Sequence, residues 1–193
     1  MNDKGTLKRL TSKGVFPYQW AFTLLLPLRN FILSPNELIN RLGIKQNATV
    51  MELGPGPGYF SLPLARYLKD GNLILADIQQ EMIDYARRRL QKRKIHNVSY
   101  YLCNGMSFDF ESESIDAIYM ITVIGEVENK DDYFKEFSRM LKPDGILSIT
   151  ELAGDPDKMS AEEIIELAGE YQFRLLKQFG NKKNFTLNFS PVM

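Results

Sequence analysis

Apolar residues follow two different spacings along the chain from residue 35 onward. Short continuous apolar runs, such as residues 73–77, are bounded by Gly, Asn and Asp and predict buried strands. Longer stretches, such as residues 80–94, carry apolar side chains at helical spacing and predict amphipathic helices. Strands that alternate with helices predict an open α/β sheet, mostly parallel, with helices on both faces. The predicted strands span residues 49–53, 73–77, 98–102, 115–121 and 146–150, and the predicted helices span residues 35–42, 59–68, 80–94, 131–141 and 160–170.

Turn and capping residues mark the ends of several predicted elements. Ser34 and Ser160 each stand three residues before a glutamate, Glu37 and Glu163, which predicts a capping box at the start of both helices. The Pro-Asp-Gly sequence at residues 143–145 predicts a turn that leads into the fifth strand. Two last apolar runs predict a closing hairpin, at residues 173–179 and 185–189 around the polar turn 180–184.

Composition and charge exclude several classes of protein. The chain has 193 residues, 44% of them hydrophobic, and its 24 basic residues balance 24 acidic ones. A net charge of zero argues against a protein held on nucleic acid by phosphate neutralisation, so the basic run at residues 87–94 is interpreted as a solvated helix face. The single Cys103 cannot form an internal disulfide, and the single His96 cannot support a His-rich metal site, so no metal is predicted. We therefore expect a soluble cytoplasmic protein.

The N-terminal segment, residues 1–44, needs separate consideration because it contains an apolar run after several basic residues. Pro17 and Gln19 interrupt the run, and no Ala-x-Ala-like cleavage site follows it, so a signal peptide is not predicted. Residues 20–33 include Pro27 and other breaks, and they fall short of the about 20 apolar residues that cross a bilayer. No stable membrane insertion is therefore predicted.

A glycine-rich turn after the first predicted strand is the most informative segment. Gly54, Gly56 and Gly58 let the backbone bend sharply and approach a ligand closely. Their Gly-x-Gly-x-Gly spacing differs from the Gly-x-Gly-x-x-Gly of dinucleotide-binding turns, and no Gly-Lys-Ser/Thr follows that would form a phosphate cradle. Asp77 ends the next strand about 20 residues on, where a carboxylate can accept hydrogen bonds from ribose hydroxyls. The combination predicts a ligand that contains a nucleoside, while a purely structural turn is the alternative.

Several ordered motifs resemble those of class I S-adenosylmethionine-dependent methyltransferases. Residues 52–58 resemble the first motif of that family, and residues 77–78 resemble the acid and apolar residue that end its second strand. Residues 114–118 resemble its Ser-Phe-Asp-x-Val strand, and residues 137–150 contain a close match to its Arg-Val-Leu-Lys-Pro-Gly-Gly segment. The resemblance implies a Rossmann-like sheet of seven strands, mostly parallel with an antiparallel last strand. It assigns residues 45–193 to a domain that binds S-adenosylmethionine.

The resemblance also implies roles for the residues of the glycine turn. Gly54, Pro55, Gly56 and Gly58 would line the methionine and ribose part of S-adenosylmethionine, with Glu52 near its ammonium group. The alternative for Glu52 is that it only stabilises the turn, since carboxylates readily accept backbone N–H groups.

A second group of implied contacts would surround the nucleoside. Asp77 would bind the ribose hydroxyls, and Ile78 would lie against the adenine. Asn104, Gly105 and Met106 fall where the family usually has Gly-Asp-Ala, so the side-chain oxygen of Asn104 would replace the usual acid as acceptor for the adenine amino group. The alternatives are a helix N-cap for Asp77 and plain core positions for Ile78 and Met106.

The reaction implied by the resemblance needs little from the protein beyond positioning. The sulfonium of the cofactor makes its methyl group electrophilic, so no catalytic residue is assigned. Ile121 and Thr122, at the end of the fourth predicted strand, would face the methyl group. Glu126 and Glu128 are candidates for a general base, and solvated loop acids are the alternative interpretation.

We therefore predict a methyltransferase that acts on a small, apolar molecule by in-line transfer. Residues 1–44, with aromatic side chains at positions 16–22, are predicted to form a helical cover over the cofactor and the methyl acceptor, and a helix packed on the sheet edge is the alternative. A catalytically silent protein that binds the cofactor and regulates or scaffolds a partner is the competing function. A nucleotide-dependent oxidoreductase is disfavoured by the spacing of the glycines.

Overall fold

The computed structural model describes residues 33–192 of the chain. The predictions for the aromatic part of the N-terminal segment therefore lie outside the described residues. Within residues 33–192, no helix combines the length and the apolar character that crossing a bilayer requires.

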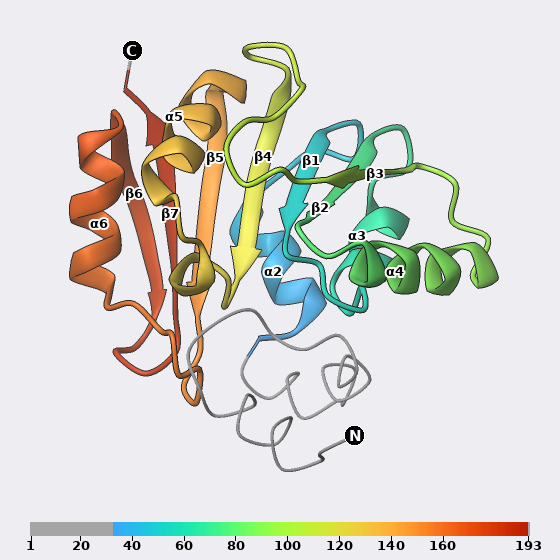
Figure 1. The fold of residues 1–193 in the computed structure, drawn as a ribbon, viewed down its shortest axis with the longest axis horizontal. Coiled ribbons are helices and arrows are strands. Elements are labelled where there is room, and N and C mark those ends of the chain that lie inside the picture. Colours follow the sequence, from blue (N-terminus) through green and yellow to red (C-terminus); the bar gives the residue numbers. More distant parts are fainter. Residues whose placement is uncertain (1–32, 193) are drawn as a thin grey trace.

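The centre of the structure is a seven-stranded sheet with the order β3-β2-β1-β4-β5-β7-β6 (Figure 1). The pairs from β3 to β5 are parallel, whereas β7 runs antiparallel to both β5 and β6. This topology confirms the predicted Rossmann-like sheet, the antiparallel last strand and the closing hairpin. The strands are β1 (Thr49–Leu53), β2 (Asn72–Asp77), β3 (Val98–Leu102), β4 (Ile115–Ile121), β5 (Leu141–Glu151), β6 (Phe173–Gly180) and β7 (Phe185–Pro191).

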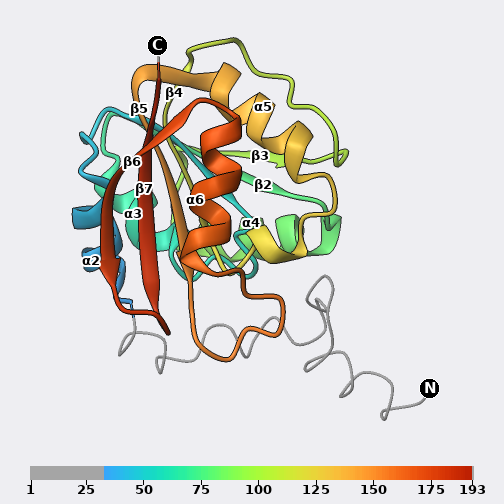
Figure 2. The same ribbon diagram turned by 90° about the vertical axis from the view of Figure 1, so that its left-hand side faces the viewer.

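Helices cover both faces of the sheet, as the alternating pattern predicts. Figures 1 and 2 show α5 and α6 on one face and α2 and α3 on the other. The side chains of β1 show why both faces are covered, because Val50 packs in the core beneath α2 and α3 while Met51 packs in the core beneath α5 and α6. The helices are α2 (Pro35–Leu42), α3 (Ser61–Tyr67), α4 (Gln80–Lys92), the 3-10 helix η3 (Ile124–Glu126), α5 (Lys130–Met140) and α6 (Ala161–Glu170).

Aromatic side chains dominate the core beneath α5. Tyr133, Phe134 and Phe137 are all buried on the face of α5 that meets the sheet. The ring of Phe137 lies edge-on to that of Tyr133 at 5.9 Å between centroids, and Phe108 meets Tyr133 at 5.2 Å. Large rings bury more apolar area than aliphatic side chains, so this cluster contributes strongly to the stability of the sheet.

The two predicted capping boxes have different outcomes. At α6 the box is complete, because the Ser160 side chain accepts from the Glu163 N–H and the Glu163 side chain accepts from the Ser160 N–H. At α2 only half of it forms. The Ser34 hydroxyl accepts from the Glu37 N–H at 3.1 Å, but the Glu37 carboxylate pairs with Arg41 instead of turning back to the cap. An ion pair one turn along the helix has thus replaced the second capping bond.

β5 begins at Leu141, five residues before the predicted start, and it includes the predicted turn at residues 143–145, where the pairing is irregular. Leu141 pairs with Ile115 and Ile146 pairs with Ala117, so the residues between them form a bulge opposite a single position of β4. Turn residues are also common in bulges, and the pairing with a neighbouring strand is what distinguishes the two. The start of α3 at Ser61 and the end of α4 at Lys92 also lie two residues inside the predicted limits.

The strand order places a topological switch point between β1 and β4. From β1 the chain moves through β2 to β3 on one side, and from β4 through β5 to the hairpin on the other. The carboxyl ends of β1, β2, β4 and β5 meet at one edge of the sheet, the lower edge in Figure 1. Ligands of open α/β sheets bind at such an edge, next to the switch point.

The aromatic core generates a prediction for Phe137→Ala. Phe137 is fully buried among other rings, so we expect the variant to lose about 3–5 kcal/mol of unfolding free energy, as measured by chemical denaturation. Lys135→Ala, on the exposed face of the same helix, removes only a surface ion pair and should change the free energy by less than about 0.5 kcal/mol. Equal losses in both variants would contradict the assignment of this core.

Candidate functional site

The glycine turn links β1 to α3 at the carboxyl edge of the sheet. Gly54, Gly56 and Gly58 have φ angles of 65°, 52° and 77°, all in the left-handed region that side chains disfavour. The N–H of Gly54 donates to the carbonyl of Ala76 at 2.8 Å, which fastens the turn to the end of β2. These positions need glycine for backbone reasons before any ligand is considered.

Close packing gives a second reason for glycine at two of these positions. A Cβ at Gly54 would lie 2.5 Å from Cγ2 of Val123, just after β4, and one at Gly58 would lie 3.2 Å from Cδ1 of Leu90 in α4. The Arg89 guanidinium, also from α4, donates to the carbonyl of Gly58. The turn is therefore held between the ends of β2 and β4 and the side of α4.

Glu52 lies beneath the turn and is almost completely buried. Its carboxylate accepts a hydrogen bond of 2.5 Å from the Ser61 hydroxyl at the start of α3. The Tyr119 hydroxyl faces the same carboxylate and lowers its pKa, although it makes no hydrogen bond of ordinary geometry. Burial outweighs both hydroxyls and raises the pKa of Glu52 to about 7. The observed contacts tie β1 to α3 across the glycine turn.

Asp77 ends β2 directly beside the turn. Its carboxylate accepts from the Gln79 N–H at 2.9 Å, and the backbone N–H groups of Ile78 and Gly56 also act on it. Burial raises its pKa to about 6, and these three N–H groups oppose the rise. Gln79, not Asp77, is the N-cap of α4, so the simple capping alternative for Asp77 is wrong.

Three large apolar side chains are exposed near the ends of β2 and β3. Ile78 and Leu102 are each 49% exposed and Met106 is 60% exposed, although most large apolar residues of the described chain are buried. The alternative that Ile78 and Met106 are plain core positions is therefore wrong. Leu102 carries no sequence signal of its own, because a residue at the end of a predicted strand is expected to be covered. Exposed apolar side chains beside a buried carboxylate suit a flat aromatic ligand.

Asn104 and Gly105 shape the loop that follows β3. The side-chain oxygen of Asn104 accepts from the N–H groups of Met106 at 2.9 Å and Ser107 at 3.0 Å, which forms a local turn. Gly105 has a φ of 83°, and its carbonyl accepts from the Asn129 side chain at 3.3 Å. The side-chain oxygen of Asn104 thus already accepts two hydrogen bonds within the loop. A hydrogen bond from an adenine amino group would be a third bond to the same oxygen.

The end of β4 contains a strained residue. Thr122 has a φ of 54°, which is rare for a β-branched residue and costs of the order of 1–3 kcal/mol. Its N–H donates to the carbonyl of Thr150 at 2.8 Å, and its hydroxyl bonds the carbonyl of Ile121. Ile121 is half-buried at the same edge. Strain of this kind accumulates at functional sites, and it leaves no mark in the sequence.

The remaining candidate residues separate by exposure. Glu126, in η3, is half-buried and Glu128 is exposed, so they differ in access to a ligand at this edge. Cys103 is buried, and burial raises the pKa of its thiol to about 12, in agreement with an inert packing role. Among residues 33–192 no group of His, Cys, Asp or Glu side chains could hold a metal ion.

The chemistry of these residues can be compared with that of S-adenosylmethionine. An adenine needs an apolar face, a ribose needs an acceptor for its hydroxyls, and a close approach needs backbone without side chains. Ile78 and Met106 offer an apolar face, and Asp77 offers an acceptor for hydroxyl groups. The glycine turn offers backbone without side chains. The residues that the structure brings together at this edge therefore fit the implied cofactor.

Comparisons with known proteins agree with this fit. A family model described as a methyltransferase domain matches residues 44–184. The ubiquinone/menaquinone biosynthesis C-methyltransferase UbiE of Haemophilus ducreyi is 28% identical over 140 residues, which are 72% of this chain and 52% of that protein. UbiE of Escherichia coli K12 is likewise 28% identical, over 72% of this chain and 55% of its own. The chain thus spans about half the length of the curated relatives it matches.

Solved structures share the fold at lower sequence identity. A SAM-dependent methyltransferase from Aquifex aeolicus superposes with a TM-score of 0.86 at 21% identity, covering 92% of this chain and all of that one. Geranyl diphosphate C-methyltransferase from Streptomyces coelicolor superposes with a TM-score of 0.70 at 15% identity, covering 82% and 79% of the two chains. That enzyme was crystallised with Mg²⁺, geranyl diphosphate and S-adenosyl-L-homocysteine.

The close approach of the turn to Val123 generates a prediction for Gly54→Ala. The variant places a Cβ in a disfavoured backbone region and also against the Val123 side chain, so both effects should lower the unfolding free energy. Gly43→Ala is the matched control, because Gly43 has a φ of 61° but no atom within 4 Å of a new Cβ. We expect Gly43→Ala to cost about 1–2 kcal/mol and Gly54→Ala about 1–3 kcal/mol more, by chemical denaturation. Equal losses of unfolding free energy in the two variants would show that the turn or the Val123 side chain shifts without a measurable penalty.

Proposed function

The chain belongs to the family of methyltransferase domains, and on this premise we propose that it methylates a small molecule with a cofactor held by the glycine turn and Asp77. The proposed activity is S-adenosylmethionine-dependent methyl transfer, and the family and the curated relatives support it. The observation that carries the proposed site is the contact between the two segments. The N–H of Gly54 bonds the carbonyl of Ala76, and the N–H of Gly56 acts on the carboxylate of Asp77.

Asp77 is the proposed acceptor for the two ribose hydroxyls. Its carboxylate is fixed by backbone N–H groups on one side, which orients the remaining lone pairs without the help of a flexible side chain. Ile78, Leu102 and Met106 support an adenine-binding surface next to it, since they are apolar and about half exposed or more. Asn104 contributes by forming the loop that presents Met106.

Gly54, Pro55, Gly56 and Gly58 are the proposed lining of the methionine and ribose part, because the turn lies at the carboxyl edge of the sheet and Gly54 and Gly56 are partly exposed. The contacts of Glu52 favour a positioning role, in which its carboxylate holds Ser61 and thereby the start of α3 under the turn. Ile121 lies at the end of β4, on the far side of the turn, where the methyl group would be presented.

The cofactor supplies an electrophilic methyl group when it is bound. The protein then has to hold an acceptor atom in line with the bond that breaks, and such positioning lowers a barrier by about 7–11 kcal/mol. A small-molecule acceptor is supported by the relatives, whose names describe C-methyltransferases of quinone biosynthesis and of geranyl diphosphate. An acceptor with an apolar part is proposed on the same grounds.

Calorimetry with S-adenosylmethionine, S-adenosylhomocysteine and NAD tests the cofactor site. We expect saturable binding of the first two and none of NAD. Asp77→Ala should weaken binding of S-adenosylmethionine by more than about 1 kcal/mol, as the loss of a charge-assisted hydrogen bond implies. Asp84→Ala, on the exposed side of α4, is the matched control and should bind normally. Unchanged affinity in Asp77→Ala would show that Asp77 does not bind the ribose. A failure of all tested small molecules to accept a methyl group would favour a catalytically silent cofactor-binding protein.

The raised pKa of Asp77 generates a prediction for the pH dependence of cofactor binding. Below a pKa of about 6 the carboxyl is protonated and loses one acceptor position, so the affinity for S-adenosylmethionine should fall as the pH falls from neutral toward about 5, by at most about tenfold per unit. Calorimetry across this range measures the fall. Asp77→Asn should bind more weakly at neutral pH and lose the dependence.

Glu52 also titrates in this range, because its pKa is about 7, so a second variant is required. Glu52→Gln should keep the fall in affinity that Asp77 causes. If Glu52→Gln abolishes the pH dependence and Asp77→Asn preserves it, the cofactor responds to Glu52 and the proposed role of Asp77 is wrong.

A further inference from the structure

Glu151, the last residue of β5, is a buried carboxyl without a hydrogen-bond partner among residues 33–192. Its side chain is fully buried, and neither carboxyl oxygen makes a hydrogen bond within the described part of the chain. An unpaired buried carboxyl costs free energy in either protonation state, and folded proteins leave very few such groups unsatisfied. Packing of the sheet does not require an acid at this position. The burial of Glu151 therefore points to a functional role.

The charged groups around Glu151 come from two segments. Glu126 lies in η3, and Asp155, Asp157 and Lys158 lie in the loop between β5 and α6. Burial and the carboxylates raise the pKa of Glu151 to about 8, and Lys158 opposes the rise.

Lys158 does not supply the missing partner. Its ammonium donates to the carbonyls of Lys182 and Lys183 and lies 4.9 Å from the centre of the Phe185 ring. Those contacts hold it toward the β6–β7 hairpin, so the hydrogen-bonding capacity of Glu151 stays unused. A metal is not the missing partner either, since the described residues contain no group of side chains that could hold one.

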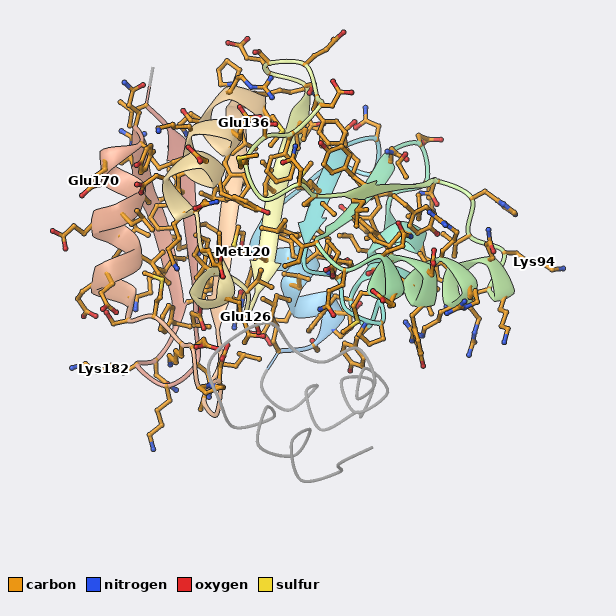
Figure 3. The ribbon with its side chains drawn as sticks, in the orientation of Figure 1. Lys94, Met120, Glu126, Glu136, Glu170 and Lys182 are labelled. Atoms are coloured by element: carbon orange, nitrogen blue, oxygen red, sulfur yellow. The ribbon has the colours of Figure 1, made fainter. Side chains whose placement is uncertain are left out.

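The position of Glu151 relates it to the methyl-transfer site. β4 alone separates β5 from β1, whose end carries the glycine turn, and the Thr122–Thr150 hydrogen bond of 2.8 Å joins the ends of β4 and β5. Figure 3 shows Glu126 at the same edge of the sheet, below the end of β4. Gly125 packs so tightly on the loop after β5 that a Cβ there would lie 1.8 Å from the carbonyl oxygen of Asp157. Glu151 therefore lies under two loops that border the edge where an acceptor would approach.

We propose that Glu151 forms a subsite for the methyl acceptor, and that it accepts a hydrogen bond from a hydroxyl or amino group of that molecule. This inference rests on the proposed function and narrows it, because it requires a donor group on an otherwise apolar acceptor. Such a donor satisfies the free carboxyl oxygens, and the negative groups of η3 and of the loop after β5 favour a positively charged amine in particular.

Small probes test the subsite on full-length protein saturated with S-adenosylhomocysteine. Phenol and benzylamine carry the donor groups, while anisole and toluene have similar shapes without one. At about pH 9, where Glu151 is mostly ionised, nuclear magnetic resonance titration should show phenol or benzylamine binding about tenfold more tightly than anisole and toluene, the effect of one charge-assisted hydrogen bond. Glu151→Met should remove this preference, and Glu170→Gln, an exposed acid at the end of α6, should retain it. No preference in the native protein, or an unchanged preference in Glu151→Met, would overturn the proposal.

A second variant identifies which donor is recognised. Glu151→Gln keeps an oxygen acceptor but loses the charge, so it should still prefer phenol over anisole if a hydroxyl is recognised. The same variant should lose benzylamine binding if an ammonium is recognised. Binding of S-adenosylhomocysteine to the native protein is measured first. Its absence would refute the proposed function, whereas its presence without probe preference would refute the subsite alone.

Thermal unfolding distinguishes a binding role from a structural one. The pKa of Glu151 lies above the ordinary value of a glutamate, so ionisation of this group destabilises the folded protein as the pH rises toward about 8. Glu151→Met should therefore unfold at a higher temperature than the native protein, by a margin that grows between about pH 5 and pH 8 and then levels off. A lower unfolding temperature at every pH would show that the carboxyl stabilises the fold, and would contradict the proposal.

Discussion

The hydrogen bond from the Gly54 N–H to the carbonyl of Ala76, 2.8 Å long, fixes the position of the glycine turn relative to the end of β2. It draws the turn after β1 across the end of β2, which brings the N–H of Gly56 to the carboxylate of Asp77. The bond forms only because Gly54 has a φ of 65° and no side chain to collide with Val123. The turn therefore lies against two neighbouring strand ends, with Gly54 and Gly56 partly exposed.

Three carboxyl groups are buried at this same edge, and burial raises the pKa of each. Glu52 has a hydroxyl partner and Asp77 has backbone N–H partners, whereas Glu151 has none within the described chain. Packing alone favours apolar residues at such positions, since buried carboxyls lower the stability of a fold. The aromatic core beneath α5 contributes stability that offsets this loss. At this edge, stability of the fold favours apolar residues, whereas the proposed function requires carboxyl groups.

Hydrophobic spacing was sufficient to predict the alternating strands and helices and the hairpin, because the central strands are continuous apolar runs buried on both faces and the helices have one buried face with a regular period. The bulge at residues 143–145 could not be predicted in this way, since turn residues and bulge residues are the same and only pairing with β4 separates them. Glu151 directly follows the fifth predicted strand, and its burial among the charged groups of η3 and of the loop after β5 depends on contacts that sequence spacing does not show. The exposure of Ile78 and Met106 likewise depends on what packs nearby, not on their own chemistry.

The strain at Thr122 is explained by its position between the two halves of the site. β4 lies between the strand that carries the glycine turn and the strand that ends at Glu151. A chain that left β4 in a relaxed conformation would be free to shift, but the Thr122 N–H holds the Thr150 carbonyl, and Val123 fills the space above Gly54. The strained residue thus lies between the proposed cofactor and acceptor sites. Because in-line transfer depends steeply on the separation of these two sites, a cost of about 1–3 kcal/mol in backbone strain is small beside the barrier that correct positioning removes.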